Sequence, residues 1–143
     1  MTPDEIDAYL NEPHLCRIGT IGPGGTIHLV TMNYGFLEGA PAFWTYRVAQ
    51  KTKNLERNPT ISMIVDSGRG YSELKGVSLM GTAEIRTDEP ALAEYYESMG
   101  TRYGEMKGDT GEAARASLGK RAVVKINIEK TMSWDHSKLG GSY

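Results

Sequence analysis

Apolar and polar residues alternate along most of the chain in a way that predicts six β-strands. The predicted strands cover residues 14–21, 26–36, 42–46, 60–66, 76–86 and 122–130, where β-branched and aromatic residues recur at alternate positions or in short runs. The last strand alternates Val124, Ile126 and Ile128 with polar neighbours and continues towards Trp134. Glycine and proline lie between these runs, as they do in the turns of antiparallel sheets. Gly81, inside the strand at residues 76–86, predicts a bend or bulge.

Other segments follow the helical period. Thr2, Pro3 and Glu5 form the pattern of a capped helix start with a capping box, and Pro13 ends that helix. Residues 48–58 and 88–104 repeat their side chains at helical spacing. A further short helix is expected around residues 112–118.

Six strands, short hairpins and few helices predict a mainly β fold, namely a small antiparallel barrel. Closure of the barrel removes the edges that an open sheet exposes. A flat sheet with helices on one face is the alternative. The length of 143 residues predicts one domain, residues 1–143, in which residues 88–119 form a helical insertion.

Charge and cysteine content narrow the class of function. The chain has 16 Lys and Arg against 18 Asp and Glu, a net charge of −2, which argues against a nucleic-acid-binding protein. Its one cysteine, Cys16, excludes an internal disulfide framework and fits a reducing compartment. The apolar runs are far shorter than the ~20 residues of a membrane span, and the acidic start has no basic signal-peptide region. We therefore expect a cytoplasmic protein with neither a nucleic-acid nor a membrane partner.

The junction at residues 44–51 gathers polar and cationic groups where a strand runs into a helix. Thr45, Arg47, Gln50 and Lys51 cluster there. A helix N-terminus offers free N–H groups and a positive dipole, which favour a phosphate. The alternative is that the cations of this helix, Lys51 among them, are only a solvated face.

The order of these segments resembles the pyridoxamine 5′-phosphate oxidase-like superfamily. The resemblance is carried by the glycine turn at 22–25, the strands at 28–32 and 43–45, the helix at 50–59, and the segments at 76–84 and 133–139. It implies a split β-barrel homodimer that binds the deazaflavin F420 or FMN at the subunit interface. The implied activity is that of an oxidoreductase transferring hydride between this cofactor and a small organic substrate.

The resemblance also implies a cofactor-binding role for particular positions. Lys51 corresponds to the phosphate-binding lysine, residues 29–32 lie along the ring, and the C-terminal residues come from the partner subunit. The implied cofactor-binding residues are Leu29, Val30, Thr31, Met32, Trp44, Thr45, Arg47, Gln50, Lys51, Gly76, Val77, Trp134 and Lys138.

Departures from the pyridoxamine phosphate oxidases favour F420 over FMN as the cofactor. Ala49-Gln50-Lys51 stands where those enzymes carry Ser-Arg-Lys, and their C-terminal Arg-x-His pattern is missing, so pyridoxal phosphate is not the expected substrate. The closer likeness is to actinobacterial deazaflavin members. A groove with Arg47, Lys51, Lys53 and Arg57 would suit an anionic tail, although the phosphate of FMN would use the same helix terminus.

Other candidates for chemistry remain open. A non-catalytic flavin- or haem-binding barrel is the rival function, with His28 the first choice of haem ligand. The three histidines have no metal-ligand spacing, so no metal site is expected, and no catalytic residue is assigned. Asp135 and His136 could relay a proton or form a structural hydrogen bond. Residues 88–119 could form a lid over the substrate or only cover the barrel end.

Overall fold

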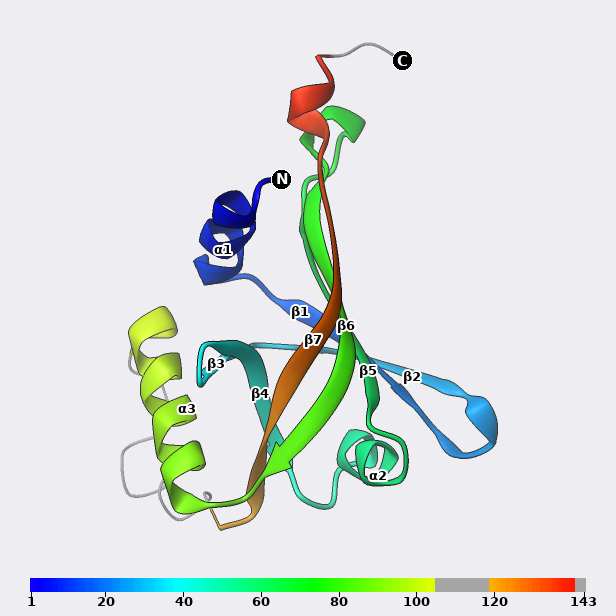
Figure 1. The fold of residues 1–143 in the computed structure, drawn as a ribbon, viewed down its shortest axis with the longest axis vertical. Coiled ribbons are helices and arrows are strands. Elements are labelled where there is room, and N and C mark those ends of the chain that lie inside the picture. The colour runs from blue at the N-terminus through cyan, green and yellow to red at the C-terminus, as the bar shows by residue number, and fades with distance from the viewer. Residues whose placement is uncertain (105–118, 141–143) are drawn as a thin grey trace.

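A computed structural model of the chain describes residues 1–104 and 119–140. It contains one curled antiparallel sheet with the strand order β2-β1-β5-β6-β7-β4-β3 (Figure 1). The strands are β1 Cys16–Ile21, β2 Ile27–Met32, β3 Gly35–Leu37, β4 Ala40–Tyr46, β5 Thr60–Ser67, β6 Lys75–Arg86 and β7 Arg121–Asp135. The helices are α1 Pro3–Asn11, α2 Gln50–Arg57 and α3 Glu89–Tyr103, with short 3₁₀ turns η1 Pro23–Gly25, η2 Tyr71–Glu73 and η3 His136–Leu139.

The mainly β fold is confirmed, but the described chain has seven strands where the sequence predicted six. The extra strand arises because the predicted strand at residues 26–36 is broken at Asn33 and Tyr34 into β2 and β3. β2 pairs with β1, whereas β3 pairs with β4. Alternating side chains continue through the break, so periodicity alone could not show that the partner strand changes.

This break curls the sheet. β2 and β3 lie at opposite ends of the strand order, yet only Asn33 and Tyr34 separate them in the chain. An extended residue spans at most about 3.6 Å, so the two edges must approach each other there. The flat-sheet alternative is therefore wrong, and the result is a split barrel around one main core. That core contains Cys16, Ile18, Phe43, Met63, Val65, Val77, Val124 and Ile126, each no more than 1% exposed.

α3 covers the outside of β3 and β4 and forms a second apolar cluster. Trp44 packs against Tyr95 and Tyr96 of this helix, with ring centroids 5.5 and 5.8 Å apart. The helix approaches β3 closely at Gly35, where an added Cβ would lie 2.7 Å from the Ser98 hydroxyl and 3.1 Å from the Tyr95 ring. A larger residue at this position would force the Ser98 side chain to shift.

Several local predictions are confirmed. The capping box of Thr2 and Glu5 is present at the start of α1. The register of β6 against β7 shifts between Met80 and Gly81, as expected of a bulge. The helix predicted at residues 112–118 lies outside the described residues. In the part of the chain that the structure describes, no helix has the length and apolar character needed to cross a membrane.

Arg102 of α3 joins the corner between β2 and β3 to the C-terminus of α1. Its guanidinium donates to the carbonyl oxygens of Leu10, Asn11, Glu12 and Tyr34 at 2.9–3.2 Å. It also lies 4.5 Å from the centroid of the buried Tyr34 ring. One cation therefore satisfies carbonyls that the end of a helix leaves without partners.

We expect Arg102→Ala to lower the free energy of unfolding by about 2–4 kcal/mol, because hydrogen bonds to a charged donor are lost and their acceptors stay partly buried. Urea denaturation of both proteins measures the change. Arg69→Ala, at an exposed position in the β5–β6 connection, is the matched control and should change stability by less than about 0.5 kcal/mol. Equal stability of the two variants would contradict the role given to Arg102.

Candidate functional site at the junction of β4 and α2

The helix that follows β4 begins without a side-chain cap. The N-cap residue of α2 is Ala49, and no side-chain hydrogen bond covers the first N–H groups of the helix. Uncapped N–H groups and the helix dipole together favour an anion at this end. The first turn of α2 therefore has donors available for a bound oxyanion.

Asn54 fixes the position of α2 on the barrel. Its side chain is fully buried and donates from Nδ2 to the Thr20 hydroxyl of β1 at 3.0 Å. Its Oδ1 accepts from Gln50 Nε2 at 2.8 Å. The neighbouring Leu55 enters the main core. Sequence reasoning missed Asn54 as an anchor, because only the fold shows that this polar side chain is buried.

Lys51 lies in this first turn, half-buried, on the same side of α2 as Leu55. Burial lowers the pKa of its ammonium group from the ordinary value. Within residues 1–104 and 119–140 the structure gives its Nζ neither a carboxylate nor a hydrogen-bond partner. A partly desolvated amine without a counter-ion in the described chain, beside uncapped N–H groups, fits a phosphate group.

The other cations predicted for this groove already have partners. Arg47 donates from Nε to the carbonyl of Arg121 at 3.1 Å, and Arg57 donates to the carbonyl of Ile21 at 2.6 Å. Lys53 pairs with Glu56 at 3.6 Å. Lys51 differs from these three cations because it is half-buried and has no partner in the described chain. This distinguishes Lys51 from a lysine on a solvated helix face, which was the alternative interpretation of the sequence.

Trp44 and Thr45 precede this junction on β4, and both side chains are nearly buried. Trp44 is 7% exposed under α3, and Thr45 is 4% exposed. Both are held in place by packing, so they would contact a cofactor mainly through the backbone or a small exposed edge.

The residues predicted along the cofactor ring divide between the two faces of β2. Leu29 is 70% exposed and Thr31 is also exposed, on the outer face of the sheet. Val30 and Met32 point to the opposite face and pack against the main core. Leu29 and Thr31 therefore present side chains to a ligand on the outer face, whereas Val30 and Met32 can offer only backbone groups there.

Trp134 of β7 covers Gly76 of β6 on this outer face. The two residues are paired in register, and a Cβ added to Gly76 would lie 2.3 Å from Trp134 Cζ2. Val77 next to it is fully buried in the main core. Glycine at position 76 thus lets the indole lie flat on the strand, while Val77 contributes only its backbone to this surface.

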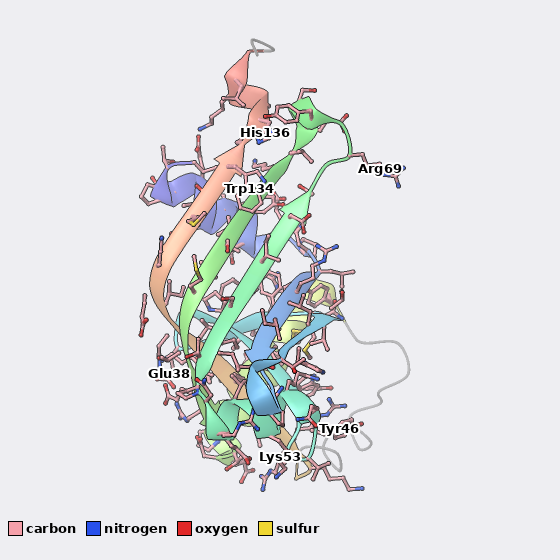
Figure 2. The ribbon with its side chains drawn as sticks, turned by 90° about the vertical axis from the view of Figure 1, so that its right-hand side faces the viewer. Glu38, Tyr46, Lys53, Arg69, Trp134 and His136 are labelled. Atoms are coloured by element: carbon pink, nitrogen blue, oxygen red, sulfur yellow. The ribbon has the colours of Figure 1, made fainter. Side chains whose placement is uncertain are left out.

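The predicted C-terminal residues lie far from Lys51 within one chain. Figure 2 shows Trp134 and His136 towards one end of the long sheet and Lys53 of α2 at the other. Lys138 of η3 forms an ion pair with Glu5 of α1 at 2.6 Å, which lowers the pKa of the Glu5 carboxyl. A single chain therefore does not bring Trp134 and Lys138 to the β4–α2 junction.

His136 and Cys16 have structural surroundings. His136 Nδ1 lies 2.8 Å from the carbonyl of Tyr71, the structural hydrogen bond that sequence offered as one of two possibilities. Burial raises the pKa of the Cys16 thiol to about 12, so this core cysteine is unreactive. No group of three or more potential metal ligands occurs in the described segments.

A separate pocket of about 530 Å³ opens between α1 and the barrel. Ile6 and Leu10 of α1, Phe36 of β3 and Ile128 of β7 supply much of its apolar lining. The predicted cofactor-binding residues are absent from its described lining. This pocket is therefore distinct from the β4–α2 junction.

Comparison with known proteins shows which protein family the chain belongs to. The profile of the family described as pyridoxamine 5′-phosphate oxidase matches residues 2–135. The chain therefore belongs to this family, as its resemblance had implied. No curated protein matches the sequence.

Solved structures agree with this assignment. The conserved hypothetical protein Rv2991 from Mycobacterium tuberculosis is 35% identical, with a TM-score of 0.90 over 100% of this chain and 90% of that one. An F420 reductase is 19% identical, with a TM-score of 0.70 over 92% of this chain and 98% of that one. The haem storage protein HutZ from Vibrio cholerae is 16% identical, with a TM-score of 0.69 over 91% and 92% of the two chains. The last two similarities show the shared fold alone.

We expect Gly76→Ala to displace the Trp134 indole, because the new methyl group would overlap Cζ2 and lie 2.9 Å from the Val65 carbonyl. Tryptophan fluorescence should move to longer wavelength as the ring becomes more hydrated. The matched control is Gly100→Ala in α3, where an added Cβ meets nothing within 4 Å. An unchanged spectrum for Gly76→Ala would show that the indole is not seated on Gly76.

Proposed function

We propose that this protein is an oxidoreductase that binds a flavin-type cofactor, F420 or else FMN, and transfers hydride between it and a small organic molecule. The observation that carries the proposal is Lys51, half-buried and without a counter-ion in the described chain, at the uncapped start of α2. When bound, the cofactor supplies the hydride chemistry, and the protein supplies binding and orientation.

Lys51 and the first N–H groups of α2 would hold the phosphate. Leu29 and Thr31 on the outer face, with the backbone of β2, would contact the ring. No catalytic acid or base is assigned, because placement of a substrate against the reactive ring can supply much of the rate enhancement. The F420 choice rests on the likeness to deazaflavin members and on the cation-rich β4–α2 segment.

The protein is proposed to act as a homodimer. Trp134 lies at the opposite end of the sheet from Lys53 of α2 (Figure 2), and Lys138 belongs to η3, which directly follows β7. These residues can therefore contact a cofactor at Lys51 only if a second subunit supplies them. In this arrangement each site combines the β4–α2 junction of one subunit with the C-terminal segment of its partner. Light scattering should then give twice the chain mass of 15.7 kDa.

Haem binding is the second candidate, and His28 carries it. This side chain is partly buried on the inner side of β2, and its buried Nδ1 has no hydrogen-bond partner in the described chain. An imidazole nitrogen without a partner is available to iron. Titration of the protein with haem, followed by its absorbance band and repeated with His28→Ala, distinguishes this function from flavin binding.

Lys51→Ala should weaken cofactor binding by about 10- to 100-fold, because a charged hydrogen-bond donor to the phosphate is lost. Lys53→Ala is the matched control, because it removes the same charge two residues further along α2. Lys53 already pairs with Glu56. Fluorescence titration with F420 and, separately, with FMN measures both variants. Equal effects of the two substitutions would remove Lys51 from the site.

The pH dependence gives a second readout of the same contact. Only the protonated amine attracts phosphate, and burial lowers the pKa of Lys51 from 10.5 in the unliganded protein. Affinity should therefore fall as pH rises into the alkaline range, because binding must then take up a proton. Lys51→Ala should lack this fall.

Mixing two inactive variants tests the shared site. In a dimer that carries Lys51→Ala in one subunit and Trp134→Ala in the other, one of the two sites keeps both residues if they come from different subunits. Random exchange should therefore restore cofactor binding at about a quarter of the sites. If the two residues acted within one subunit, mixing would restore none.

A further inference from the structure

Arg121, the first residue of β7, lies between two aromatic rings of β4. Its guanidinium carbon is 4.5 Å from the ring centroids of both Trp44 and Tyr46. Tyr46 is also its partner in the sheet register. The stacking fixes the plane of the guanidinium and directs its remaining N–H donors along the edge of that plane.

Arg47 is held against the same point by backbone carbonyls. Its Nε donates to the Arg121 carbonyl at 3.1 Å, and its Nη2 lies 3.5 Å from the carbonyl of Thr87. Its backbone N–H donates to the carbonyl of Lys120 at 3.0 Å. The Arg47 guanidinium is therefore anchored at the backbone of Arg121, one residue beyond the end of β4.

Neither cation of this pair has a carboxylate partner within the described residues. Other arginines at the surface do: Arg17 pairs with Asp66, and Arg86 pairs with Asp88 at 2.8 Å and with Glu38. The Nε of Arg121 is buried and has no acceptor in residues 1–104 and 119–140. Cationic side chains with unused donors and no carboxylate partner are stabilised by a bound anion.

We propose that Arg47 and Arg121 form a binding site for a carboxylate group of a small-molecule ligand, separate from the phosphate contact at Lys51. A planar carboxylate matches the fixed edge of a stacked guanidinium and can accept two parallel hydrogen bonds from it. Arg47 adds a second charge, and the exposed Tyr46 ring forms one wall. The site stands on these contacts and does not depend on the cofactor proposal.

Trp44 reports directly on this site, because Arg121 stacks on its ring. The chain has two tryptophans, so a Trp134→Phe background leaves Trp44 as the sole tryptophan, which is excited selectively over the tyrosines at wavelengths that they do not absorb. Titration of this protein with citrate, at ionic strength held constant with sodium chloride, should give a saturable change in Trp44 fluorescence.

Arg121→Gln and Arg47→Gln in that background should each weaken citrate binding by about tenfold or more. Arg121→Lys keeps the charge but lacks the planar fork, so it should also weaken binding. Arg69→Gln, the same charge change at an exposed position far along the sheet (Figure 2), should bind citrate like the parent. Circular dichroism melting checks folding, and the exposed Arg47 variant keeps the test valid if Arg121→Gln does not fold.

A non-saturable response, or equal weakening by Arg69→Gln, would overturn the proposal. So would full retention of citrate binding by both glutamine variants. Two supporting outcomes distinguish the natural source of the carboxylate. These arms use the protein with Trp134 intact. If Arg121→Gln weakens binding of intact F420 but not of F420 that keeps its phosphate and lacks the carboxylates of its tail, the carboxylate belongs to the cofactor. If both forms of F420 bind to Arg121→Gln as tightly as to the protein with Arg121, while citrate binding is lost, the carboxylate belongs to a separate ligand. Failure of all cofactor binding would refute the proposed function and leave the citrate result standing.

Discussion

The two-residue link between β2 and β3 is the constraint on which the rest of the structure depends. Because it joins strands at opposite ends of the sheet order, it forces the sheet to curl and leaves an inner and an outer face. Tyr34 in this link is fully buried and donates its hydroxyl to the Leu10 carbonyl at 2.6 Å. Burial raises the pKa of this hydroxyl to about 12, so it remains a donor at physiological pH. Arg102 of α3 donates a further hydrogen bond to the Tyr34 carbonyl in this link.

The curl also determines which side chains remain for function. β2 directs Val30 and Met32 into the core and leaves Leu29 and Thr31 on the outer face. At the β4–α2 junction most polar side chains are used internally: Asn54 anchors the helix, Gln50 supports Asn54, and Arg57 binds a backbone carbonyl. Lys51 lacks such a partner in the described chain. The proposed cofactor contact thus rests on a lysine that the fold does not use internally, and not on a recognisable catalytic motif.

Sequence reasoning was most successful where local chemistry dominates. The capping box at Thr2 and the bulge at Gly81 follow from short-range hydrogen bonding and backbone freedom, and both occur as predicted. It was wrong on the number of strands, because a change of pairing partner leaves no mark in the alternation of residues. It favoured Lys51 over Lys53 from the helix terminus and the family resemblance, but it could not show the difference in burial or the pairing of Lys53 with Glu56.

The sequence by itself determined the main helices, most of the strands and the position of a cationic helix start after a strand, because these depend on periodicity and on neighbours along the chain. The family followed from the resemblance that the order of these segments carries. Only the tertiary structure decided which of those cations has no partner among the described residues, that Trp134 covers Gly76, and that Arg121 stacks between Trp44 and Tyr46. These contacts join residues far apart in sequence, and strand register, which no single segment encodes, brings them together.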